Sequence, residues 1–213
     1  IVLRITFIEQ IRRQIYSGQP SDDADITIGL VNTWLEQGIA VAAKTNYTDN
    51  LKLDGISYVN NSFYSTFKNI AVTEDEQFVY KVTLPQIPVG IGANEGISML
   101  TFRDTDSRQI SQSVIWLTQN QRTFFDGMRA IPNKLLAYSE GKYAYIKSTL
   151  LLTAYTANVT LISGGNPSDL QSELNVPGDY IPVIVEYLKK QLAFQRQMPK
   201  DVTNDGEDFI TTT

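Results

Sequence analysis

The fold is decided near the C-terminus by residues 176–198, which read VPGDYIPVIVEYLKKQLAFQRQM. Asp179 is the predicted N-cap of a helix, and Pro182 falls in its first turn, where a missing amide costs nothing. Apolar residues then recur at i, i+3, i+4, i+7 and i+11, which predicts one buried helical face. These residues are Ile181, Ile184, Val185, Leu188 and Leu192. The helix is predicted to end before Pro199, and an acidic tail follows.

Two further helices are predicted at the other end of the chain. Thr6 and Glu9 match a capping box, which starts a helix over residues 6–17 after a short strand or extended arm. A second helix is predicted over residues 25–44. Gly29 and Gly38 lower its intrinsic stability by about 1 kcal/mol each relative to Ala, which would be tolerated if another helix packs closely there. Its buried stripe consists of Leu30, Val31, Trp34, Leu35, Ile39 and Ala42. We expect the C-terminal helix to bury its apolar face against these two helices.

Between the terminal helices lies a block rich in Tyr, Phe, Val, Thr and Ile, which is typical of strands. Residues 134–138 and 142–146 flank Ser139-Glu140-Gly141, a pattern that predicts a β-hairpin. Further strands are predicted over residues 78–84, 97–102 and 150–162. Residues 112–117 fit a strand or the start of a helix, and residues 119–128 and 168–174 favour short helices.

The predicted fold class is therefore α+β, with a helix pair and a C-terminal helix forming a helical body around an antiparallel β block. The predicted parts are residues 1–50 for the N-terminal helices, 51–165 for the β block, and 166–213 for the final helix and acidic tail. The chain begins at Ile1 rather than Met, so its numbering is expected to start inside the gene product or after processing.

Composition restricts the possible chemistry. The chain has no Cys and no His, which excludes disulfides, zinc–thiolate sites and Ser–His or Cys–His triads. The formal net charge is −5, whereas a protein that grips DNA normally presents a basic face. We therefore expect neither an enzyme nor a free-standing DNA-binding protein.

Several short motifs resemble ligand-binding sequences but lack residues that such sites need. The spacing of Gly90, Gly92 and Gly96 is one residue off the dinucleotide-binding fingerprint, and no strand precedes it. Asp22, Asp23 and Asp25 suit a helix N-terminus better than a metal site. A calcium loop beginning at Asp201 would need a bidentate Glu at its twelfth position, where Thr212 stands. We predict no cofactor and no metal.

Three segments carry a resemblance to a known family, namely residues 11–23 (IRRQIYSGQPSDD), 120–134 (NQRTFFDGMRAIPNK) and 176–182 followed by Glu186-Tyr187. With the helix–sheet–helix layout, they resemble the head-to-tail connector (adaptor or ring) proteins of short-tailed bacteriophages. The likeness is strongest to those of crAss-like phages that infect Bacteroidales.

The resemblance implies a structural virion protein without enzymatic activity, made in the bacterial host cytoplasm. It implies a homo-oligomeric ring of about twelve copies between the portal protein and the next tail ring. DNA would pass through this ring without specific binding, and no membrane is involved. Because terminal segments commonly dock in such rings, we predict interface residues near both ends of the chain. They are Arg12, Arg13, Tyr180, Tyr187, Phe194, Met198 and Phe209.

Two alternatives stay open from the sequence. One is another tail, stopper or minor capsid protein of the same virion. The other is a monomeric glycan- or peptide-binding β module that uses the aromatic residues of the β block, such as Tyr138, Tyr143 and Tyr145.

Overall fold

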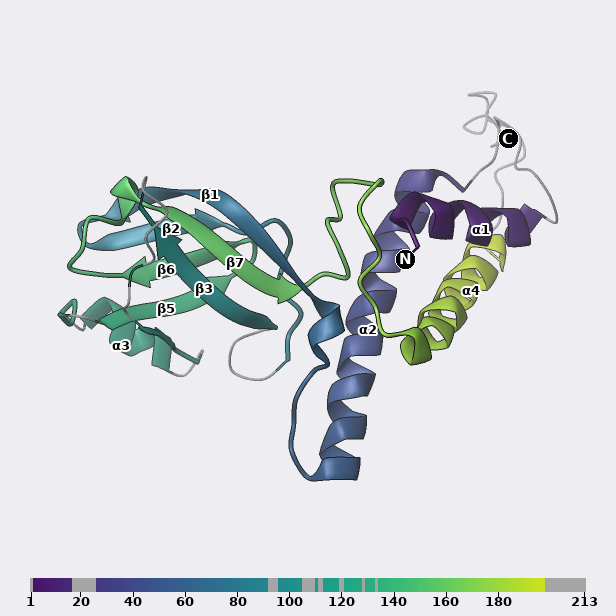
Figure 1. Ribbon diagram of the computed structural model, residues 1–213, viewed down its shortest axis with the longest axis horizontal. Helices are drawn as coiled ribbons and strands as arrows, with labels where there is room; N and C mark the ends of the chain where they lie inside the picture. Colours follow the sequence, from purple (N-terminus) through teal and green to yellow (C-terminus); the bar gives the residue numbers. More distant parts are fainter. Residues whose placement is uncertain are drawn as a thin grey trace, which may run out of the picture.

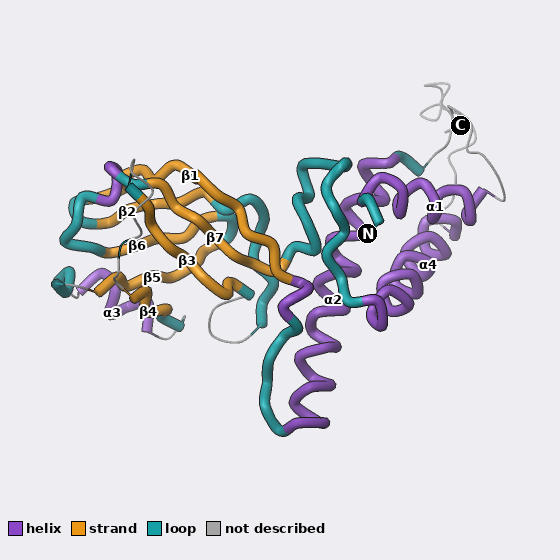
Figure 2. Tube along the Cα trace, in the orientation of Figure 1, coloured by secondary structure: helices purple, strands orange, loops and turns teal. Residues whose placement is uncertain are grey.

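The chain forms two lobes, a helical body and a β lobe, in a computed structural model (Figure 1). The structure describes residues 2–16, 26–91, 96–104, 110, 113–118, 121–127, 129–132 and 134–197. The helical body contains α1 (Arg4–Tyr16), α2 (Ile28–Asp54) and α4 (Ile181–Gln197). The β lobe contains all the strands and the short helix α3 (Arg122–Gly127), and Figure 2 shows the separation of helix and strand clearly. The predicted α+β class is confirmed.

The β lobe is a seven-stranded sheet with the order β3-β7-β1-β2-β6-β5-β4. Its strands are β1 (Tyr64–Glu76), β2 (Val79–Thr83), β3 (Ile97–Arg103), β4 (Ser113–Trp116), β5 (Lys134–Glu140), β6 (Tyr143–Lys147) and β7 (Thr156–Ile162). Neighbouring strands are antiparallel, except that β4 runs parallel to β5. The predicted hairpin is β5–β6, with residues 141–142 at its turn.

The long strand β1 joins the two halves of this sheet. Its first part, up to Ala71, pairs with β7, and the part from Val72 pairs with β2. The register shifts between Phe67 and Ile70, and Asn69 there has a φ of 59°. The sheet thereby folds over on itself, and a core fills the space between its halves. Members of this core are Val82, Ile146, Phe102, Val159 and Leu161.

A separate core holds the helical body together. The predicted α4 face contributes Ile184, Leu188 and Leu192, which are buried with the stripe of α2 and with apolar residues of α1. A Cβ atom at Gly38 would lie 3.2 Å from the Ile184 side chain, so α2 and α4 approach closely at this glycine. At Gly29 a Cβ atom would meet only Thr27 Oγ1 among the described residues, at 3.9 Å. Thus α4 docks on the first two helices through the side chains that its periodicity indicated.

The two lobes meet where β1 begins and β7 ends. Phe63, in the 3-10 turn just before β1, and Ile162, the last residue of β7, belong to the core of the helical body. Gly165 follows β7 with a φ of 113°, and a Cβ atom there would lie 2.3 Å from the Glu173 carbonyl oxygen. Only glycine fits this turn, which presses the segment 166–175 against the helical body.

The predicted boundaries of the first two helices were wrong. Helix α1 begins at Arg4, before Thr6, because the carbonyls of Ser172 and Leu170 accept the amides of Arg4 and Ile5. These contacts replace the predicted capping box. Helix α2 begins after the N-cap Thr27 and continues to Asp54, well past the predicted end at residue 44. No glycine or proline interrupts the helix after Gly38 until Gly55 closes it with a φ of 69°.

Three other local predictions also need correction. Residues 168–174 form turns rather than a helix, because the Asn166 and Asp169 side chains accept local backbone amides. Residues 150–162 are not one strand, since a 3-10 turn at 152–154 precedes β7. Asp179 is not the cap of α4; it lies in a 3-10 turn that leads into the helix. The division into parts at residues 50 and 165 stays a prediction.

Candidate subunit interface

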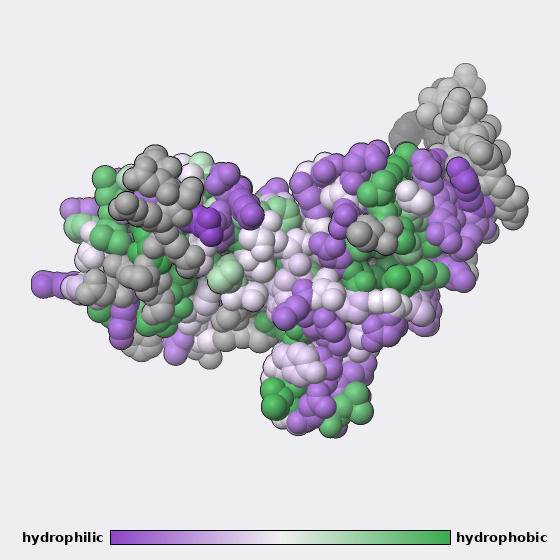
Figure 3. Space-filling model, viewed as in Figure 1, coloured by the Kyte–Doolittle hydropathy of each residue, from purple (hydrophilic) through white to green (hydrophobic). Residues whose placement is uncertain are grey.

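The C-terminal end of α2 projects from the body of the molecule and carries exposed apolar side chains (Figures 1 and 3). Leu51 is 47% exposed, Leu53 82%, Ile56 66% and Tyr58 47%. We call these four residues the apolar tip. Grouped apolar exposure of this kind marks interaction surfaces more often than isolated apolar residues do.

Hydrogen bonds hold the apolar tip in a fixed shape. The Asn46 Oδ1 atom accepts from the Asn60 amide at 2.8 Å, and Asn50 Nδ2 donates to the Tyr58 carbonyl at 3.0 Å. The Tyr58 hydroxyl donates to Asp54 Oδ2 at 3.0 Å, and this bond raises the pKa of the Tyr58 hydroxyl. The chain after α2 is therefore tied back to the helix, and the tip presents a preorganised surface.

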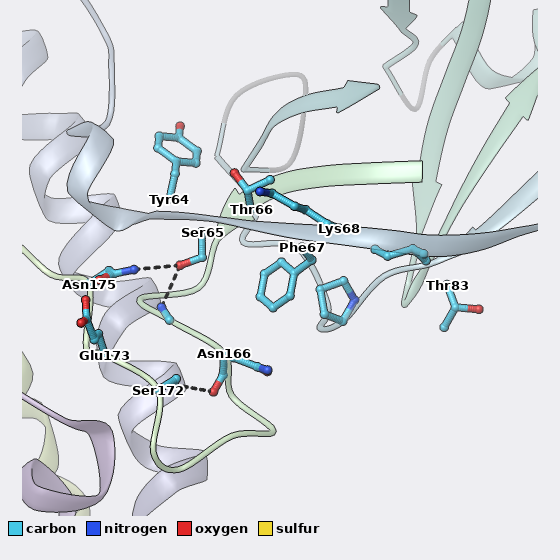
Figure 4. A pocket seen from close by; sticks show the side chains of 13 residues that line it. Tyr64, Ser65, Thr66, Phe67, Lys68, Thr83, Asn166, Ser172, Glu173 and Asn175 are labelled. Atoms are coloured by element: carbon cyan, nitrogen blue, oxygen red, sulfur yellow. Dashed lines mark hydrogen bonds between the residues drawn. The ribbon is translucent and has the colours of Figure 1, made fainter. Parts of the chain in front are cut away.

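Two hollows lie beside the junction of the lobes. The first has a volume of about 620 Å³ and lies between β1 and the segment 165–175 (Figure 4). Ser65 Oγ accepts from the Gly165 amide at 2.9 Å and from Asn175 Nδ2 at 3.5 Å, and Ser172 donates to the Asn166 carbonyl. These hydrogen bonds connect β1 to the segment 165–175. The hollow therefore belongs to the contact between the two lobes.

The second hollow, which we call the α2 hollow, has a volume of about 600 Å³. One wall is the middle of α2, and the opposite wall is the loop 85–90 with Lys142, Pro167 and Ser168. Ile87 on this loop is 68% exposed. The Oε1 atom of Gln86 is buried without a hydrogen-bond partner among the described residues, while its Nε2 donates to the Ile162 carbonyl. The hollow thus has an exposed apolar side chain, Ile87, on one of its walls.

Comparison with known families decides what kind of protein presents these surfaces. The family model CrAss_Ring_2, described as phage tail ring protein 2, matches residues 6–208. The chain belongs to this family of phage tail ring proteins. The predicted resemblance is confirmed, and the chain has a structural role in a tail ring and is a virion component. No curated protein sequence matches it.

In this ring protein, an ion pair fixes α1 on α2 close to the α2 hollow. The side chain of Arg4 is fully buried, and its Nε donates to Asn32 Oδ1 at 2.6 Å. Its Nη2 lies 3.4 Å from Glu36 Oε1, and Glu36 lines the hollow. Burial lowers the pKa of Arg4 and raises the pKa of Glu36. Glu36 is therefore an acidic side chain in the lining of the α2 hollow, and the buried Arg4 guanidinium holds it in position.

The predicted interface residues occupy different environments in the ring protein. Tyr180 donates to Asp49 Oδ2 at 3.1 Å and Tyr187 to Gln37 Oε1 at 3.0 Å, so both tie the C-terminal part to α2 within one chain. Arg12 Nε donates to the Ile26 carbonyl. Arg13 is exposed, and Phe194 is 63% exposed.

Met198 and Phe209 lie outside the described residues. An interface role for any of the seven residues stays a prediction. Phe194 fits such a role best, since its ring meets solvent on α4.

The tyrosines considered for glycan binding pack largely on themselves. Tyr138 is 9% exposed; its ring stacks on that of Tyr145 at 5.0 Å and meets the edge of Phe125 at 4.7 Å. Arg122 lies over Tyr138, and Lys81 lies 4.1 Å from the centre of the Tyr143 ring. Stacking surfaces that sugars or bases would need are thus already covered at Tyr138.

Sequence reasoning missed the apolar tip altogether. The sequence predicts a β block from residue 51 onward, whereas residues 51–54 are the last turn of α2. The signal that could have found the tip is Gly55, a typical C-cap, which follows an uninterrupted helix-compatible segment from residue 39. Four apolar residues flanking such a cap, with no helical stripe continuing from the core, indicate an exposed helix end.

Proposed function

We propose that this tail ring protein forms a closed ring of about twelve copies between the portal protein and the next tail ring, where it forms part of the DNA exit channel. The observation that carries the proposal is the projecting apolar tip of α2. Its four exposed side chains have no apolar neighbours that cover them within the described part of the chain, and subunit contacts in a ring would remove them from water.

Burial of the apolar tip by a neighbouring subunit would favour assembly. Fully burying a leucine or isoleucine side chain stabilises a complex by about 1.5–3 kcal/mol relative to leaving it exposed. Leu53 and Ile56 are the most exposed members of the tip, so both would contribute when a neighbour covers them. The tip is already held by hydrogen bonds from Asn46 and Asn50, which limits the entropy lost on association.

The charge of the chain suits a channel through which DNA slides. The net charge is −5, so there is no excess of cations to neutralise phosphates and stall the duplex. Some cations that the structure describes are also paired, such as Arg122 with Glu140 at 2.6 Å and Lys190 with Glu186 at 2.8 Å. We propose that DNA passes without specific binding and that the protein is not an enzyme.

The proposal includes synthesis in the bacterial host cytoplasm before incorporation into the virion. None of the described helices is long and apolar enough to cross a membrane.

Multi-angle light scattering of the purified chain, alone and with the portal protein, tests the proposal, together with images of the assembled particles. We expect a ring-sized species whose formation or stability increases with portal, and density for the ring directly below the portal. A protein that stays monomeric under both conditions would contradict it. A ring that forms without portal affinity, and lies elsewhere in the tail, would show the alternative of another tail or stopper protein.

A further inference from the structure

We infer that the apolar tip of one copy occupies the α2 hollow of the neighbouring copy. Each subunit would then contact one neighbour with its tip and the other neighbour with its hollow. The inference rests on the ring proposed above and identifies its partner surfaces. The occupant of the α2 hollow is a second copy of this chain, specifically Leu53 and Ile56 with the turn between them.

A tip cannot fill the hollow of its own chain. Both features belong to α2, with Ala40 in the hollow and Leu53 at the tip. Thirteen residues of α-helix separate their backbones by about 20 Å, and a continuous helix cannot fold back over that distance. A projection and a hollow at different places on one chain can pair only head to tail between copies, and such a contact generates a closed ring when its rotation closes, as in the ring proposed above.

The two surfaces match in apolar character and in size. The tip offers Leu53 and Ile56, and the hollow offers the exposed Ile87 and the half-buried Ala40. Its volume of about 600 Å³ lies within the range of about 300–1,000 Å³ in which protein pockets hold a ligand. Contact would therefore cover exposed apolar side chains on both partners, including Ile87, rather than on one alone.

Charges around the two surfaces are complementary as well. Lys52 and Asp54 stand on either side of Leu53 at the tip, and both are exposed. The hollow is lined by Glu36 on one side and by Lys44 and Lys142. A cation and an anion on the tip thus meet an anion and cations on the hollow, and such an arrangement sets the register of a contact.

The absence of cysteine from the chain allows a clean test by crosslinking. The variant Leu53→Cys/Ile87→Cys carries one thiol on each surface, and both parent side chains are exposed enough for the fold to tolerate the change. The control is Leu151→Cys/Ile87→Cys, because Leu151 is a leucine of the β lobe that is 61% exposed. Both variants and the single variants are treated with a short bismaleimide at a concentration where light scattering detects the ring.

We expect a ladder of crosslinked species that extends beyond the dimer for Leu53→Cys/Ile87→Cys, and at least tenfold less product for the control and for each single variant. Mixing the Leu53→Cys and Ile87→Cys single variants, one of them enlarged by a tag, should give a mixed dimer. Crosslinked dimers from Leu53→Cys alone would indicate a two-fold contact and would overturn the inference. An equal ladder from the control would overturn it too.

The outcomes separate this inference from the proposed function. A ring that forms while Leu53→Cys/Ile87→Cys gives no ladder refutes the contact between tip and hollow and leaves the ring intact. A chain that stays monomeric with and without portal refutes both.

Discussion

The two parts of helix α2 carry the same kinds of apolar side chain, which are buried in the first part and exposed in the last turns. In its first part Leu35 is 0% exposed and Ile39 is 1% exposed, within the core of the helical body. In its last turns Leu51 and Leu53 are 47% and 82% exposed. The difference lies in what packs against the helix, since α1 and α4 cover the first part and no described element covers the second.

The comparison separates folding from assembly along a single element. Buried apolar residues of the first part stabilise the chain itself, whereas those of the tip can contribute only when another molecule covers them. Mutations of the same chemical type in the two parts should therefore affect different measurements. The following predictions are ordered by their expected effect on the free energy of unfolding of the isolated chain.

Leu35→Ala should destabilise the chain most, by about 2–5 kcal/mol, because it removes a fully buried side chain and leaves a cavity. The matched control is Leu53→Ala, the same change on the exposed part of the same helix, for which we expect a change within about 0.5 kcal/mol. Urea denaturation followed by circular dichroism measures both. Equal losses at the two positions would show that the tip packs within the chain.

Asn46→Ala should cost about 1–3 kcal/mol, because the buried Asn46 side chain accepts the Asn60 amide and that donor would lose its partner. The change tests whether the tip is held in shape from within α2. Hydrogen exchange at the Asn60 amide should accelerate along with the loss in stability. Unchanged protection of that amide would mean that the tip is not tied back through Asn46.

Thr27→Ala should cost about 1 kcal/mol, because the Thr27 hydroxyl caps α2 by accepting the Leu30 amide at 3.2 Å. Thr27→Ser keeps the hydroxyl and serves as the control, with little expected change. This effect belongs to the N-terminal end of α2, far from the apolar tip, so ring formation by the folded protein should be unaffected. Loss of assembly at full folding would contradict the division of α2 into two roles.

Leu53→Lys should have the smallest effect on unfolding, within about 0.5 kcal/mol, since an exposed cation near the end of a helix is favourable. The effect of the same substitution on ring assembly should be large. A charge placed at the centre of the tip should prevent ring formation, which light scattering would show as a shift to monomer. A ring of normal size and stability would show that the tip is not part of the subunit contact.

The sequence by itself determined the features that depend on local chemistry. Helical periodicity in residues 181–192 predicted the buried face of α4, and the Gly-containing loop at 139–141 predicted the β5–β6 hairpin. Of the two glycines expected to be tolerated beside a closely packed helix, Gly38 has such a neighbour in α4. The ring family was also within reach, because three segments carried a resemblance that the family match confirms.

The tertiary structure decided where elements begin and end and which apolar residues remain uncovered. Helix α1 starts at Arg4 because carbonyls from residues 170 and 172, far away in sequence, accept its first amides. The exposure of Leu53 could not follow from its own chemistry, because burial depends on the presence of a neighbour. Periodicity shows which face of a helix can be buried, and only the packed fold shows where that burial stops.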